Sequence, residues 1–183
     1  MRAAFGAAGQ AEDFTCFKFV DETSTNPRPP YARAEGGQRA HQATPLHSGP
    51  NATLVAVLTP HGLQAALNMS GAVNGDVFAA YLGQVLGPTL VPGDVVVLDN
   101  LPAHKVAGLA ELMEARNARL LYLPPYSPDF NPIELAFSKP KTWLRTAQVC
   151  THDALEAVIQ TATDRMTEHY AKNWFDHCGY HVQ

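Results

Sequence analysis

The sequence has little of what marks secreted proteins, membrane proteins and disulfide-rich domains. Its 183 residues include only three cysteines, Cys16, Cys150 and Cys178, and no C-x-x-C pair. Neither a disulfide framework nor a cysteine zinc site is therefore expected. No apolar run reaches the roughly 18 residues that a membrane-spanning helix needs. The alanine- and glycine-rich start, Met1 to Gln10, lacks the apolar segment of a signal peptide. These absences predict a reduced, cytoplasmic protein without a membrane partner.

Positive charge is also scarce. The chain has 13 lysines and arginines against 17 aspartates and glutamates, which gives a formal net charge of -4. A self-sufficient DNA-binding module is usually basic, so this balance counts against one. It does not count against a nuclease, because nucleases gather acidic side chains around metal ions. With 46% hydrophobic and 16% charged residues, the chain is expected to fold as one domain rather than remain disordered.

The order of the predicted elements indicates an α/β fold. Antiparallel strands come first and β-α-β units follow, which is the order of a mixed sheet flanked by helices in a ribonuclease H-like fold. Residues 1–13 are expected to be loose, and residues 14–183 to form the domain. Strands are expected at 14–20, 51–59, 63–69, 95–98 and 119–123, and helices after an Asn74 cap, at 104–115 and at 151–170.

Three carboxylates stand out by their positions. Asp21 follows the first predicted strand, Asp99 ends a buried strand, and Glu134 opens a helix after a proline-rich connection. In an open sheet, functional groups gather at the carboxyl ends of strands. If the first and fourth strands are neighbours, Asp21 and Asp99 lie side by side. Carboxylate oxygens of this kind can hold two Mg²⁺ ions about 4 Å apart, which clamp the attacking and leaving oxygens of a phosphodiester.

Each carboxylate also has a purely structural interpretation. Asp99 could belong to a turn, and Asp21 could be a solvated strand end. The segment from Asn131 to Glu134 has the pattern of a helix-capping box, with asparagine as the cap, proline next and glutamate at the third helical position. Taken alone, that fragment favours capping over catalysis.

Three longer blocks favour catalysis. Residues Phe19–Thr25, Val97–His104 and Leu123–Glu134 resemble the blocks of bacterial insertion-sequence transposases of the Tc/mariner-like superfamily. The 34 residues between Asp99 and Glu134 are the spacing of that family. The resemblance extends from about Phe17 to Tyr180 and implies a ribonuclease H-like DDE catalytic domain.

The resemblance also assigns roles. It implies that Asp21, Asp99 and Glu134 are the metal-binding triad. We expect this triad to bind two Mg²⁺ or Mn²⁺ ions, with Asp21 between them, and Glu22 and Asn100 to support the ligands. Water would cleave the DNA at the element's end, and the freed 3′-hydroxyl would then attack target DNA.

Four residues are candidates for contacts with DNA phosphates. Lys141 and Arg145 follow Glu134 on one helical face, and Lys105 and His104, just past Asp99, are weaker candidates. Salt bridges on a solvated face are the alternative interpretation.

Two features depart from the family. Only 20 residues precede Asp21, so the helix-turn-helix region is expected on a separate polypeptide or domain. Pro140 stands where leucine is expected and costs roughly 3 kcal/mol in a helix, or kinks it. Both features leave open a catalytically inactive, truncated remnant that only folds or associates with other chains. A different ribonuclease H-like nuclease, such as a junction resolvase, is the third alternative. Transposases usually act as dimers or larger assemblies, so a homo-oligomer is expected.

Overall fold

The computed structural model describes residues 13–25, 35–37, 52–101, 104–147, 157, 160–161 and 163–182. On the helix that ends at Ala147, it describes side chains only as far as Lys139. The predicted loose start falls outside these ranges except for Asp13. No helix in the described part of the chain is long and apolar enough to cross a membrane.

The centre of the fold is a five-stranded mixed sheet with the order β3-β2-β1-β4-β5. The first three strands form an antiparallel meander, while β4 and β5 add to β1 in parallel. The predicted hairpin and the buried fourth strand are confirmed. The bounds of the strands are β1 Phe17–Thr25, β2 Ala52–Thr59, β3 Gly62–Ser70, β4 Val95–Leu98 and β5 Arg119–Tyr122.

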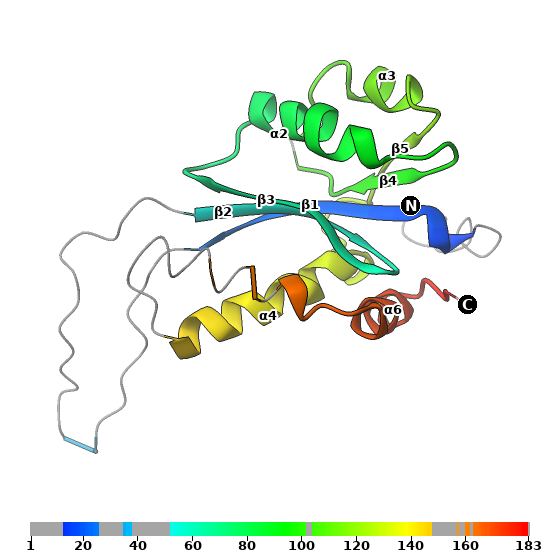
Figure 1. The fold of residues 1–183 in the computed structure, drawn as a ribbon. Helices are drawn as coiled ribbons and strands as arrows, with labels where there is room; N and C mark the ends of the chain where they lie inside the picture. The colour runs from blue at the N-terminus through cyan, green and yellow to red at the C-terminus, as the bar shows by residue number, and fades with distance from the viewer. Residues whose placement is uncertain are drawn as a thin grey trace.

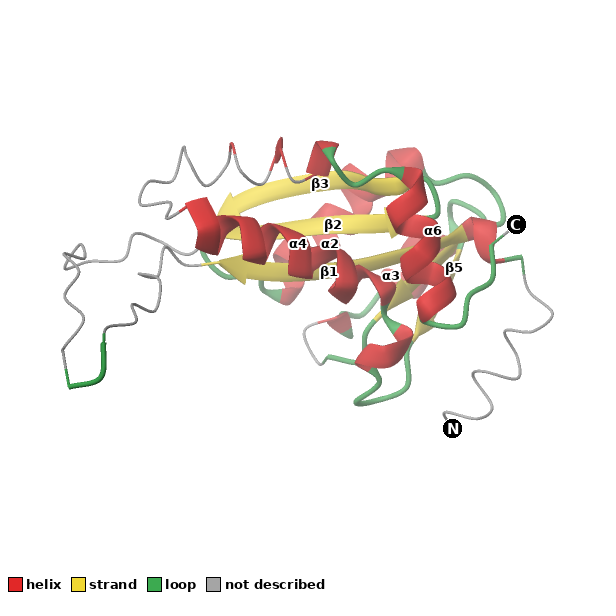
Figure 2. Ribbon diagram, turned by 90° about the horizontal axis from the view of Figure 1, so that it is seen from below, coloured by secondary structure: helices red, strands yellow, loops and turns green. Residues whose placement is uncertain are grey.

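Helices cover both faces of this sheet (Figures 1 and 2). The helices α2, Gly75–Tyr81, and α3, Leu109–Glu114, lie on one face. The helices α4, Pro132–Ala147, and α6, Glu168–His177, lie on the other. A π-helical turn at Leu82–Leu86 continues α2, and short 3-10 helices span Phe14–Cys16, Gly87–Thr89 and Pro128–Phe130.

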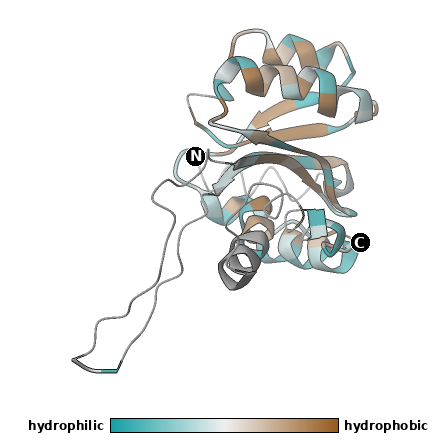
Figure 3. Ribbon diagram, turned by 60° about the vertical axis from the view of Figure 1, so that its left-hand side comes forward, coloured by the Kyte–Doolittle hydropathy of each residue, from teal (hydrophilic) through white to brown (hydrophobic). Residues whose placement is uncertain are grey.

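Alternation along the strands divides the core into two clusters. Phe17 and Phe19 point to the α4 and α6 side, where they pack with Phe137 and Phe175. Val20 points to the opposite side. The second cluster joins alternate strand residues to α2 and α3, including Val55, Val96, Leu98, Phe78 and Met113. Figure 3 shows many hydrophobic segments in the strands and in α2 and α3, while α6 carries many hydrophilic residues.

Local signals explain several boundaries. Asn74 caps α2 as predicted, and its side chain accepts a hydrogen bond from the Val77 N–H at 2.9 Å. The helix predicted at 104–115 is wrong at its start, because α3 begins only at Leu109. Gly108 just before it has φ +86°, a left-handed conformation that does not continue a helix.

The last predicted helix, 151–170, is confirmed at the described residues 157, 160–161 and 163–164, but it is wrong as one continuous helix. The chain leaves helical structure after Asp164 and enters α6 at Glu168. Thr167 between them has an extended backbone, with φ -75° and ψ 163°, which begins a new helix instead of continuing one. Residues 148–156 lie outside the described ranges. The helix α4 continues past Pro140 to Ala147.

Candidate active site

Sheet pairing brings two of the three predicted carboxylates together. The strands β1 and β4 are parallel neighbours as expected, and Val20 pairs with Leu98. Asp21 and Asp99 each come one residue later, so they lie side by side at the end of this pairing. One expectation was wrong in detail: Asp21 does not follow the first strand but lies within it, because β1 continues to Thr25 along β2.

Strand alternation places Asp21 on the side of the third carboxylate. Asp21 pairs with Ala56, which belongs to the core beneath α4, whereas Glu22 pairs with Val55 of the opposite core. Successive side chains point to opposite faces. Asp21 therefore shares a face with α4, the helix that carries Glu134, and Glu22 does not.

Asp21 is an unusual residue for the interior because it is only 5% exposed. Its Oδ1 accepts a hydrogen bond from the Glu22 N–H at 2.8 Å, and its Oδ2 accepts one from Asn131 Nδ2 at 2.9 Å. Burial, followed by the nearby charges of Asp99 and Glu134, raises the pKa of Asp21 to about 7. The hydrogen bond from Glu22 opposes this shift only in part. The three carboxylates therefore lie close enough to repel one another.

Asn131 is a site residue that the sequence did not assign. Its pattern predicts a helix cap, but its side-chain amide turns to Asp21, and the Glu134 N–H bonds to the Asn131 backbone carbonyl at 3.2 Å. Asn131 is buried, so it joins the start of α4 to the middle of β1. Its position inside the third sequence block was the available signal.

Asp99 is held by two hydrogen bonds to one oxygen. Its Oδ1 accepts from the Leu101 N–H at 3.1 Å and meets His104 Nδ1 at 2.5 Å. The other ring nitrogen of His104 lies 2.7 Å from Glu22 Oε2. Burial lowers the pKa of His104, but the hydrogen bonds to Asp99 and Glu22 outweigh it and raise that pKa to about 9. His104 is thus a cation between two carboxylates.

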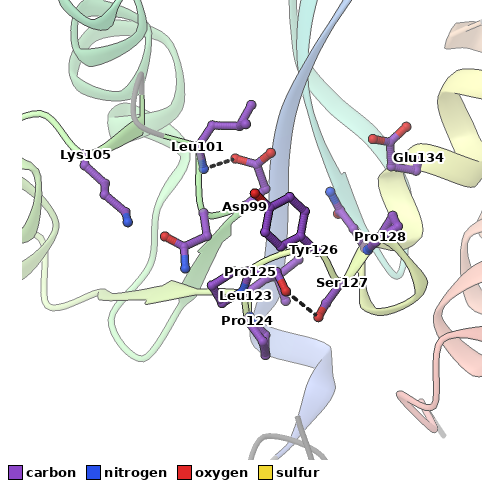
Figure 4. A pocket seen from close by; sticks show the side chains of 12 residues that line it. Asp99, Leu101, Lys105, Leu123, Pro124, Pro125, Tyr126, Ser127, Pro128 and Glu134 are labelled. Atoms are coloured by element: carbon purple, nitrogen blue, oxygen red, sulfur yellow. Dashed lines mark hydrogen bonds between the residues drawn. The ribbon is translucent and has the colours of Figure 1, made fainter. Parts of the chain in front are cut away.

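A cavity of about 420 Å³ opens beside these residues. Figure 4 shows Glu134 entering it from α4, with Asp99 and Lys105 on the side of β4. Asn100 also lines the cavity, and within the described part of the chain its buried Oδ1 has no hydrogen-bond partner. The rest of the lining is Leu101, Leu123, Pro124, Pro125, Tyr126, Ser127, Pro128 and Asn131.

These side chains suit divalent cations. Three carboxylates and an unpartnered amide oxygen are the hard oxygen ligands that Mg²⁺ and Mn²⁺ accept, and the partners that Asp21 shows are neutral donors. Among the described residues, no three His, Cys, Asp or Glu side chains already have an arrangement that could hold a metal ion. Gathering them around an ion requires side-chain rotation, which the exposed Glu134 can make.

The predicted DNA-contacting residues have different outcomes. The prediction for His104 is wrong, because this side chain is completely buried and its ring meets Asp99 and Glu22. Lys105 is exposed and lines the cavity beside Asp99. Lys141 and Arg145 lie on α4, but their side chains are outside the described part of the structure, so their roles stay predictions.

Comparison with known proteins gives one family and one fold. A family described as DDE superfamily endonuclease matches residues 17–156. No curated protein matches the sequence. The catalytic domain of Mos1 mariner transposase is similar in structure, with a TM-score of 0.69 and 12% identity over 95% of this chain and 82% of that one. The Mos1 transposase paired-end complex with left transposon end has a TM-score of 0.72 and 15% identity, over 95% of this chain and 55% of that one. The mariner Mos1 paired end complex with Mg has a TM-score of 0.71 and 16% identity, over 97% of this chain and 57% of that one.

At these identities the similarity shows the fold. The predicted α/β, ribonuclease H-like fold, a mixed sheet flanked by helices, is confirmed. The chain spans between 55% and 59% of the length of the Mos1 chains in the larger complexes.

Proposed function

The chain belongs to the DDE superfamily endonuclease family, and from this membership we propose that it is the catalytic domain of a DNA transposase. It cleaves DNA at the ends of an element and joins the freed strand to target DNA. The observation that supports this most directly is the proximity of three carboxylates, one from each sequence block: Asp99 and Glu134 line one cavity, and the buried Asp21 lies close enough to feel the charge of both.

Asp21, Asp99 and Glu134 are the residues that would hold two Mg²⁺ or Mn²⁺ ions. Asp21 would lie between the ions, because it is central and feels the charge of both other carboxylates. Structures of the mariner Mos1 paired end complex with Mg and with Mn agree with this choice of metals. When bound, such ions lower the pKa of water and stabilise the charge that develops on a phosphodiester.

The chain's own residues prepare this site. Asn131 and the Glu22 N–H hold the two oxygens of Asp21, which fixes the plane of its carboxylate. Asn100 would support the site by accepting a hydrogen bond from water at its amide oxygen, which has no partner among the described residues. Lys105 binds a DNA phosphate at the edge of the cavity, and Lys141 and Arg145 extend this contact along α4.

Recognition of the element's ends requires more than this domain. The net charge of -4 is unsuited to tight DNA binding, so we place sequence recognition on a helix-turn-helix polypeptide or domain. A homo-oligomer would bring two ends together. The resemblance to insertion-sequence enzymes places this activity in the bacterial cytoplasm.

Nicking of supercoiled plasmid tests the function without knowledge of the terminal repeats. At low ionic strength and with Mn²⁺, the wild-type chain should nick the plasmid, and EDTA should stop it. Glu134→Gln should lower the rate at least about 1,000-fold, which corresponds to roughly 4 kcal/mol of transition-state stabilisation.

The matched control is Glu114→Gln, the same change at an exposed position on α3. It should nick at the wild-type rate. Nicking by Glu134→Gln at the wild-type rate would refute the proposal. So would no nicking by the wild type with Mn²⁺ or with Mg²⁺, and either result would favour a chain that does not cut DNA.

A further inference from the structure

His104 connects Glu22 of β1 to Asp99, the residue after β4, through its imidazole ring. It is completely buried, at 0% exposed. Its Nδ1 meets Asp99, which follows β4, and its Nε2 meets Glu22 of β1. Each ring nitrogen thus lies within hydrogen-bond distance of a carboxylate oxygen. The residues form a continuous chain of hydrogen bonds, Glu22–His104–Asp99.

The ring has little freedom to turn. It stacks on Phe78 of α2, with ring centroids 4.1 Å apart and planes 19° from parallel. Its backbone is also held, because the Tyr122 hydroxyl donates to the His104 carbonyl at 2.9 Å and the His104 N–H bonds to the Leu101 carbonyl at 3.1 Å. A side chain fixed on all sides transmits its own position to its hydrogen-bond partners.

We propose that His104 is a positioning residue, braced by Glu22, that orients the Asp99 carboxylate toward the divalent cations of the active site. This inference rests on the proposed function, since it assumes that Asp99 binds a metal. It gives Glu22 an indirect part: its side chain lies on the sheet face opposite Asp21 and acts through His104.

The hydrogen bonds to Asp99 have the arrangement that such a role requires. Both of them, from His104 and from the Leu101 N–H, end on Oδ1. Among the residues that the structure describes, none donates a hydrogen bond to Oδ2. Fixing one oxygen from behind sets the plane of the carboxylate and leaves the other oxygen for a ligand in the cavity that Asp99 lines.

Stability alone gives a weaker account of this cluster. A buried ion pair is often no more stable than apolar residues of the same volume, because both charges lose their hydration. Phe78 and its neighbours offer an apolar environment that would accept such a replacement. A completely buried histidine whose two ring nitrogens meet two carboxylates, one of them in the predicted triad, is therefore better explained by what it does for Asp99.

Mn²⁺ titration by calorimetry on single and double variants tests the inference. His104→Ala should weaken Mn²⁺ binding about 10- to 100-fold, the usual effect of losing a hydrogen-bond partner of a metal ligand. His104→Asn places an amide donor where Nδ1 lies and should recover part of that loss. Glu22→Gln should weaken binding in the wild type and weaken it less in His104→Ala, because the brace acts through the ring, whereas the charge that Glu22 exerts on Asp21 is present in both backgrounds.

Control variants distinguish a failure of the His104 inference from a failure of the proposed metal site. His61→Gln changes an exposed histidine that pairs with Glu168 at 3.7 Å and should bind Mn²⁺ as the wild type does. If His104→Ala does not fold, judged by circular dichroism, Glu22→Gln still tests the brace, because its side chain is only partly buried. Unchanged affinity in folded His104→Ala, or equal Glu22→Gln losses in both backgrounds, overturns the inference alone. Failure of the wild type to bind Mn²⁺ overturns the proposed function instead.

Discussion

Asp21→Asn should yield a protein that no longer cleaves DNA and is nevertheless more stable than the wild type at pH 8 without metal. The loss of cleavage, at least about 1,000-fold, follows from removing the central metal ligand. The gain in stability follows from removing a buried charge, because burial and the charges of Asp99 and Glu134 raise the pKa of Asp21 to about 7. An amide at this position cannot ionise and avoids that penalty.

The raised pKa of Asp21 determines whether the free energy of unfolding rises or falls with pH. The folded state holds the Asp21 proton up to about pH 7, whereas the ordinary value is 3.8. The free energy of unfolding contributed by this group is therefore highest below pH 3.8 and falls as the pH rises toward 7. Each pKa unit is worth about 1.4 kcal/mol, and asparagine gives up one of two hydrogen bonds at about 1 kcal/mol, so the net gain at pH 8 is roughly 1–3 kcal/mol.

Urea unfolding in EDTA at pH 5 and pH 8 measures this gain. Asp21→Asn should exceed the wild type at pH 8 and lose that advantage at pH 5. Asp76→Asn, the same change at an exposed position on α2, should show no such pH dependence. A variant that is less stable than the wild type at pH 8 would mean that Asp21 is not an electrostatic burden on the fold.

Phe175→Ala should destabilise the protein by about 3–5 kcal/mol, the usual cost of removing a large aromatic side chain from a packed core. Phe175 of α6 is completely buried and packs edge-on against Phe19 of β1, with ring centroids 5.3 Å apart. Tyr180 packs against both rings. The helix α6 thus supports the strand that carries Asp21, although it lies beyond the residues that match the family.

Tyr170→Ala provides the comparison within the same helix. Tyr170 is 44% exposed, and its ring stacks on Trp174 and lies 5.2 Å from Lys139 Nζ of α4. It should cost about 1 kcal/mol or less. Thermal and urea unfolding of both variants would show the difference. Similar small losses in both would mean that α6 is not part of the core.

Patterns of period two and buried apolar runs predicted the sheet well. The run Val95–Leu98 is a strand with the predicted bounds, and its pairing with β1 places Asp99 beside Asp21 as expected. Helix starts that depend on backbone conformation were harder to predict. The left-handed Gly108 and the extended Thr167 interrupt apolar patterns that continue through them in the sequence.

The sequence predicted the three carboxylates of the candidate site, but it did not predict the residues that hold those carboxylates in place. Asp21, Asp99 and Glu134 stand out because each ends a strand-like pattern or opens a helix, inside blocks that resemble a known family. The contacts of Asn131 with Asp21 and of His104 with Glu22 join residues 110 and 82 positions apart. Such distant pairs depend on how α4 and the loop after β4 pack on the sheet, which no local pattern encodes.

Calorimetric titration of Mn²⁺ into the wild-type chain and into Asp99→Asn tests the central claim most directly. The account predicts that the wild type binds Mn²⁺ and that Asp99→Asn, with the same fold by circular dichroism, loses most of this affinity. Equal binding by the two proteins, or no binding by the wild type even with a DNA duplex present to supply phosphate, would contradict a metal site built from Asp21, Asp99 and Glu134.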